Sequence, residues 1–232
     1  MGNSKIFLFP EFKRDPILRA VDSGDPAALE QLLSQGVMTD NFGSAVAMAL
    51  GDPVMLTVFL KHGLDPNYIF KRFGETLMSR TVCEGHKATF DLLVSRGARI
   101  DTVDAYGFGL LHQAAGGGQP ELAEILIQRG LDVNARTTTS QGTPLIDAAR
   151  NNHPAVMEIL VRHGADIEAR DVDLVTPLII AAKAGKFEAA EWLVRHGADI
   201  NAQDDSEKTA LDWARVNNHA MVVELLESRN HS

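Results

Sequence analysis

The residues best suited to chemistry are eight histidines and a single cysteine, Cys83. Imidazole and thiolate groups hold zinc when several of them reach one ion at about 2 Å. His62, His163 and His196 each stand one residue before a glycine, at the same place in a recurring sequence. We therefore expect them on successive structural units rather than around one ion, and we predict neither a metal site nor a cofactor.

Catalytic motifs are also missing from the sequence. It contains no nucleophile elbow, no phosphate-binding loop and no His-Glu-x-x-His run. The glycine-rich stretch "AAGGGQP" at 114–120 lies between two expected helices, whereas a phosphate-binding loop follows a strand. Cys83 has no base beside it and is expected to be inert. We predict a protein that is not an enzyme; an enzyme that uses a groove of the fold as its pocket is the weakest alternative.

Composition and charge narrow the choice of partner. The chain has 232 residues, 45% of them hydrophobic, and a formal net charge of −9, which disfavours binding to a phosphate backbone. One cysteine rules out an intramolecular disulfide. The apolar run at residues 6–9 ends at Pro10 and is too short for a membrane span or a signal peptide. We predict a cytoplasmic protein whose partner is neither nucleic acid nor membrane.

The positions of the chemistry-bearing residues depend on a repeat that runs through the chain. "RHGADIEARD" at 162–171 returns as "RHGADINAQD" at 195–204. Apolar, helix-like segments end at Gly36, Gly63, Gly97, Gly130, Gly164 and Gly197, and the last four intervals alternate between 34 and 33 residues. A steady period of this length is typical of a stacked repeat protein.

One unit of the repeat can be interpreted residue by residue. Thr176 suits a helix N-cap and Pro177 suits the first helical position. Gly185 is expected to end this first helix, and Gly197 a second one. An extended hairpin follows. Because one helix pair cannot bury both of its apolar faces, neighbouring units must stack.

Several units carry the same short motifs. They include Thr143-Pro144-Leu145 with Ala148-Ala149, Thr176-Pro177-Leu178 with Ala181-Ala182, and Gly197-Ala198-Asp199-Ile200-Asn201-Ala202. This pattern resembles the ankyrin repeat. The resemblance implies an all-α solenoid, an elongated, curved array of helix-turn-helix-hairpin units. We expect an N-terminal extension at 1–14 and an ankyrin-repeat domain at 15–232, with units near 15–41, 42–70, 71–104, 105–137, 138–170, 171–203 and 204–232, the first and last acting as caps.

The resemblance also implies where a partner protein would bind. In the family, hairpins and first helices together form a concave binding surface. The hairpin candidates are Arg72, Glu75, Tyr106, Phe108, Asp173, Asp205 and Lys208. The first-helix candidates are Arg80, Gln113, Asp147, Arg150, Lys183 and Trp213.

Aromatic residues are the strongest anchors in this set, because tyrosine and tryptophan often dominate interface energy. Tyr106 and Phe108 are predicted contacts, although both could instead pack on the neighbouring hairpin. Trp213 could either face the groove or fold over the terminal cap. Trp192 is expected in the core.

Charge at the later hairpins suggests the kind of partner. Asp173, Asp205 and Glu207 surround Lys183 and Lys208, which favours a protein with a basic or mixed-charge surface, although these charges could simply be solvated. We expect a monomer that acts by binding, as an inhibitor of an enzyme or as an immunity protein against a toxin. The alternative is an adaptor that joins partners without inhibiting them. The segment "IFLFPEF" at 6–12 could cover the first cap or serve as a docking strand.

Overall fold

The computed structural model describes residues 15–70 and 74–229. Within these residues the regular elements are helices, and extended segments pair only through isolated β-bridges such as Val103 with Gly109. The described residues divide into two compact units, residues 15–70, 74–81 and 86–99, and residues 82–85 with 100–229. The all-α prediction is confirmed. None of the described helices is both long enough and apolar enough to pass through a bilayer.

The first unit is built from short helices in consecutive pairs. Its helices are α1 (Pro16–Asp22), α2 (Pro26–Ser34), α3 (Phe42–Met48) with the short 3₁₀ helix η2 (Ala49–Gly51), α4 (Pro53–Lys61), most of α5 (Leu77–Cys83), and α6 (Lys87–Ser95). Three of them start at an aspartate followed by a proline. Asp15 at α1 accepts hydrogen bonds from the amides of Ile17 and Leu18. The carboxylate thus satisfies amides that lack a helical partner, and the proline has no amide to satisfy.

Aromatic and aliphatic side chains fill the core of the first unit. Phe59 and Phe90 are almost completely buried, and Phe42 packs edge-on against Phe59 with ring centroids 5.5 Å apart. The hydroxyl of Thr89 on α6 donates a buried hydrogen bond to the carbonyl of Leu50 in η2 at 2.6 Å. This bond joins two successive helix pairs through a polar contact inside the core.

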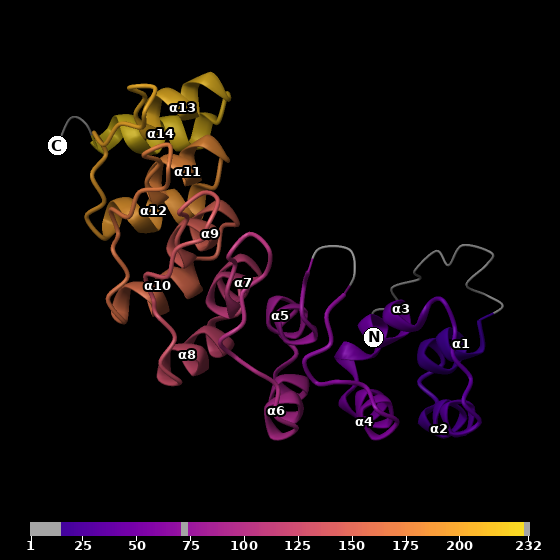
Figure 1. The fold of residues 1–232 in the computed structure, drawn as a ribbon. Coiled ribbons are helices and arrows are strands. Elements are labelled where there is room, and N and C mark those ends of the chain that lie inside the picture. The colour runs from indigo at the N-terminus through magenta and orange to yellow at the C-terminus, as the bar shows by residue number, and fades with distance from the viewer. Residues whose placement is uncertain (1–14, 71–73, 230–232) are drawn as a thin grey trace. The chain divides into compact units, whose positions relative to one another are not determined.

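The second unit is a stack of helix pairs. Its elements are α7 (Leu110–Gly116), α8 (Pro120–Gln128), α9 (Pro144–Arg150), α10 (Pro154–Arg162), α11 (Pro177–Lys183), α12 (Phe187–Arg195), α13 (Ala210–Val216) and α14 (Ala220–Arg229). The pairs follow one another in chain order (Figure 1). The odd-numbered helices form one layer, here called the inner layer, and the even-numbered helices form the other.

Local sequence explains where these helices begin and how they pack. Thr176 caps α11 by accepting a hydrogen bond from the amide of Ile179, and Pro177 stands at the first helical position, as predicted. Ala181 and Ala182 are fully buried, so their small side chains let neighbouring helices approach closely. Leu193 on α12 is also fully buried, and burying one such side chain stabilises the fold by about 1.5–3 kcal/mol.

Backbone hydrogen bonds join the hairpins of successive pairs in the second unit. The amide of one hairpin donates to a carbonyl of the hairpin before it, in the pairs Thr138 to Tyr106 at 3.0 Å, Val172 to Ser140 at 2.9 Å and Asp205 to Asp173 at 3.0 Å. In three of these hairpins an aspartate accepts backbone amides; Asp171, for example, accepts those of Asp173 and Val175. In the hairpin at 137–142, Oγ1 of Thr137 accepts the amide of Gly142 instead. The hairpins are therefore held as a row before any partner binds.

Trp192 departs from the sequence prediction. The helix α12 buries Ala189, Ala190 and Leu193, and Trp192 is only half-buried at the border of that face. Its ring stacks on His196 with centroids 3.7 Å apart and planes 14° apart. The prediction of a core residue was wrong, because two alanines and a leucine already fill the buried face of α12.

Candidate functional site

The inner layer brings several predicted residues onto one face. Each inner helix of the second unit has seven residues, and its fourth and seventh residues are three apart and so share a face. Because the helices are neighbours in the order α7, α9, α11, α13, these positions form two rows. The fourth positions are Gln113, Asp147, Ile180 and Trp213, and the seventh positions are Gly116, Arg150, Lys183 and Val216.

Trp213 is the best-supported aromatic of this face. Its indole nitrogen donates a hydrogen bond to Oδ2 of Asp204 at 2.6 Å. The ammonium groups of Lys183 and Lys208 lie 3.9 Å and 4.4 Å from the ring centroid. Both distances are within the range of an attractive cation–π contact. The half-buried ring is thus held by one carboxylate and two cations.

The carboxylate of Asp204 is held in its ionised form. Burial alone would raise the pKa of Asp204, but hydrogen bonds from the amide of Lys208, the indole of Trp213 and the amide of Ser206 outweigh it. The net pKa therefore lies below the ordinary value. Negative charge on Asp204 strengthens its hydrogen bond with the indole.

Asp147 has an unusual environment in the centre of the inner layer. Its Oδ2 is fully covered and lacks a hydrogen-bond partner among the described residues. Burial raises the pKa of Asp147 to about 7, and the positive charge of Arg150 opposes this shift only in part. A carboxyl in this state carries a proton in a large fraction of molecules near neutral pH.

The two predicted hairpin aromatics differ. Tyr106 is 51% exposed, and its backbone carbonyl is engaged with Thr138. Phe108 is half-buried and packs edge-on against His112, with centroids 5.6 Å apart and planes 77° apart. Phe108 therefore supports a histidine of its own helix pair, while the ring of Tyr106 is accessible.

The remaining predicted residues of the second unit are largely accessible. Arg150, Asp173, Lys183 and Asp205 are exposed, whereas Gln113 and Lys208 are partly buried. The amide of Asp205 donates a hydrogen bond to the carbonyl of Asp173, so these two acidic residues lie on adjoining hairpins.

Sequence reasoning missed Leu174 as a candidate. It is 44% exposed and adopts a left-handed backbone with φ of 58°, at the hairpin place that Gly107 occupies with φ of 83°. Leucine is strained in this conformation, which costs about 1–2 kcal/mol. The available signal was a bulky apolar residue where another unit has glycine. Asp204 was not among the candidates, because its bond to Trp213 joins residues nine apart in the sequence.

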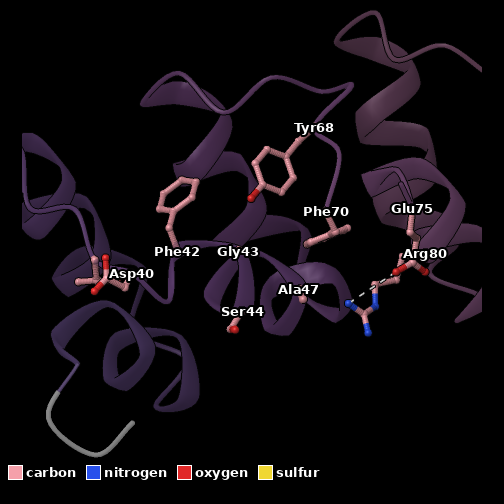
Figure 2. A pocket seen from close by; sticks show the side chains of 10 residues that line it. Asp40, Phe42, Gly43, Ser44, Ala47, Tyr68, Phe70, Glu75 and Arg80 are labelled. Atoms are coloured by element: carbon pink, nitrogen blue, oxygen red, sulfur yellow. Dashed lines mark ion pairs between the residues drawn. The ribbon is translucent and has the colours of Figure 1, made fainter. Parts of the chain in front are cut away.

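Two predicted residues, Glu75 and Arg80, belong to the first unit, and Arg72 lies outside the described residues. Arg80 and Glu75 are 3.9 Å apart and lie at one end of a hollow of about 770 Å³, with Asp40 at the other end (Figure 2). Phe70 also lines it, and the guanidinium carbon of Arg80 lies 5.4 Å from its ring centroid.

Histidine side chains contact neighbouring helix pairs. His112 is buried; its Nδ1 lies 3.3 Å from the amide of Gly109, and its Nε2 lies 3.2 Å from the carbonyl of Gly142 in the next hairpin. Because Nδ1 accepts, Nε2 carries the proton, and burial lowers the pKa of His112. His163 contacts Glu124 of the preceding pair at 2.9 Å. Over the described ranges, no three His, Cys, Asp or Glu side chains gather closely enough to hold a metal ion.

Comparison with known families identifies the repeat. The family described as Ankyrin repeats (3 copies) matches residues 44–137, 79–171 and 170–231. The chain belongs to the ankyrin-repeat family, as its sequence motifs predicted. No curated protein matches the chain. Ankyrin repeats are generally non-catalytic modules for protein–protein interaction, so the chain carries a surface that binds another protein.

Proposed function

We propose that the chain binds a partner protein through the inner helices and hairpins of residues 100–232, here called the inner surface, and inhibits that partner by covering it. The observation that carries the proposal is the row of hairpins joined by backbone hydrogen bonds. A surface that is already ordered loses little conformational entropy on binding. Such a surface can bind tightly enough to block its target.

Exposed apolar side chains on this row supply anchors for binding. Tyr106, Val172 and Leu174 are 51%, 54% and 44% exposed. Leu174 is in addition strained, and strain of this kind tends to persist at functional sites. Trp213 is held in place at the end of the same surface by Asp204. Aromatic anchors with fixed geometry carry a large share of interface energy.

The charges of the inner surface favour a partner of mixed charge. Asp173 and Asp205 lie exposed on adjoining hairpins, where they would attract basic side chains. Arg150 and Lys183 occupy neighbouring seventh positions of the inner helices, where they would meet acidic ones. Complementary charges steer association and suppress wrong partners more than they add affinity. The proposal places this binding in the cytoplasm, with the chain as a monomer.

Capture experiments with matched variants test the surface. The immobilised full chain is compared with Tyr106→Ser/Val172→Ser and with Val54→Ser/Met221→Ser, which removes apolar residues of 60% and 63% exposure from α4 and α14. We expect the hairpin variant to lose the captured partner and the control to retain it. Equal capture by all three proteins would refute the inner surface.

The activity of the captured partner distinguishes an inhibitor from an adaptor. Titration with the wild-type chain should abolish that activity at a one-to-one ratio, and the hairpin variant should not. An adaptor would leave the activity unchanged while still forming the complex. That result would reject inhibition without rejecting the binding surface.

A further inference from the structure

The hollow in the first unit is lined by aromatic groups and closed at one end by charge. Phe42, Tyr68 and Phe70 line it, and Ser44 and Ala47 contribute from α3 (Figure 2). Tyr68 and Phe70 pack edge-on with centroids 5.2 Å apart. Gly43 lets the Tyr68 ring lie close to α3, since a Cβ there would come within 3.1 Å of the Tyr68 hydroxyl.

The size of the hollow suits a short peptide segment. Its volume of about 770 Å³ falls within the range of about 300–1,000 Å³ typical of ligand pockets. None of its three aromatic side chains is fully buried. Covering such rings with apolar groups is favourable, because it removes apolar surface from water.

Asp15, the first described residue and the point from which the preceding chain departs, lies beside this hollow. The Oδ2 of Asp15 accepts a hydrogen bond from the side chain of Asn41 at 3.0 Å, and both sequence neighbours of Asn41 line the hollow. Burial alone would raise the pKa of Asp15, but the bonds from Asn41 and from the α1 amides hold its pKa below the ordinary value. The attachment point is therefore fixed by an ionised carboxylate. Residues 6–12 stand three to nine positions earlier in the chain, and an extended chain can reach about 10–30 Å over these separations.

The chemistry of that preceding segment matches the hollow. Residues 6–12 read "IFLFPEF", five apolar side chains with one proline and one glutamate. The apolar side chains suit the aromatic lining. Residues 6–12 lie outside the described residues.

We propose that residues 6–12 of this chain bind in the hollow lined by Phe42, Tyr68 and Phe70. The inference is independent of the proposed function, since it rests on the first unit alone.

Disulfide trapping in the full chain tests this docking. In a Cys83→Ser background, Glu11→Cys is combined with Ser44→Cys, inside the hollow, or with Ser23→Cys, exposed just after α1 and outside the hollow. Both partner substitutions are nearly isosteric, and residue 23 is closer in sequence to residue 11. We expect the pair 11–44 to close at least about tenfold faster than the pair 11–23, because docking raises its effective concentration. Equal rates, or faster closure of 11–23, would overturn the proposal.

Two further variants test whether disulfide closure depends on the apolar side chains of residues 6–12. Phe7→Asp/Phe9→Asp in the 11–44 protein should remove its advantage, whereas Asn3→Asp/Ser4→Asp adds the same charge and should preserve it. Closure that is insensitive to the first variant contradicts docking through the apolar side chains. Closure between chains, seen as a disulfide dimer by mass, would assign the hollow to a second copy and also reject the proposal.

Discussion

The indole nitrogen of Trp213 donates a hydrogen bond to Oδ2 of Asp204 at 2.6 Å, while Oδ1 of the same carboxylate accepts the amides of Ser206 and Lys208. One side chain therefore shapes the last hairpin and orients the aromatic ring beside it. The ring is held in place before a partner binds, so the Trp213 side chain loses little conformational entropy on binding.

Trp213→Phe should lower the free energy of unfolding by about 1–3 kcal/mol at pH 7, because Asp204 loses a hydrogen bond made in its charged form. A carboxyl with a depressed pKa contributes stability above its unfolded pKa of about 3.9 and loses it as pH falls through the folded value. The gap between variant and wild type should therefore shrink below about pH 4. Urea unfolding across pH measures it. Trp192→Phe, which keeps its stack on His196, is the control and should change little; a gap that persists in acid would contradict the assignment.

Tyr106→Ala and Phe108→Ala should separate binding from folding. The exposed Tyr106 should cost about 0.5 kcal/mol or less in stability when truncated. Its loss should weaken partner affinity by about tenfold or more. Phe108→Ala removes the ring that packs on His112 and should cost about 2 kcal/mol of stability. Thermal unfolding and calorimetric titration provide both readouts, and the reverse assignment of effects would show that Phe108 is the anchor.

Asp147→Asn should stabilise the protein more at pH 8 than at pH 5. The folded-state pKa of about 7 exceeds the ordinary value of 3.8, so the folded state holds a proton that the unfolded state has lost. Stability therefore falls as pH rises from about 4 to about 7, by an amount that approaches about 4 kcal/mol. The asparagine variant lacks this loss.

The test of Asp147 uses the difference between variant and wild type. The lowered pKa of His112 has the opposite effect on stability. As pH falls below about 6.5, the protein loses the stability that the neutral imidazole contributes. This contribution cancels in the difference. Asp173→Asn removes the same charge from an exposed hairpin and is the matched control. A difference between Asp147→Asn and wild type that is flat from pH 5 to pH 8 would exclude a raised pKa at Asp147.

Leu174→Gly should raise stability by about 0.5–1 kcal/mol, because glycine adopts the left-handed backbone without the side-chain clash and loses part of that gain in entropy. The same change should weaken partner binding. Leu174→Ala keeps the strain and removes the side chain, so only binding should fall.

Gly107→Leu is the converse variant of Leu174→Gly. A Cβ on Gly107 would approach the amide nitrogen of Thr138 to 2.5 Å, so we expect marked destabilisation. Denaturant unfolding of all three variants tests the comparison. A destabilised Leu174→Gly would mean that the leucine side chain supports the hairpin instead of a partner.

The sequence by itself determined the repeat and its helices. The spacing of the glycines, the Thr-Pro pair at residues 176–177 and the buried alanines at 181–182 act within one unit or between neighbours, so their physics is local. Helix caps, left-handed glycines and close helix packing depend on residue type and short spacing. These local features were enough to predict a helical repeat protein of the ankyrin family.

Only the tertiary structure decided which candidate side chains are supported and which are accessible. The side chains that neighbouring repeats bring close decide three features of the site. These are the exposure of Tyr106, the packing of Phe108 on His112 and the unpartnered oxygen of Asp147. The raised pKa of Asp147 has the same origin, because desolvation is summed over atoms from several helices. Burial and desolvation of this kind come from residues that are distant in the sequence, so no local sequence pattern predicts them. They nevertheless set the chemistry of the inner surface.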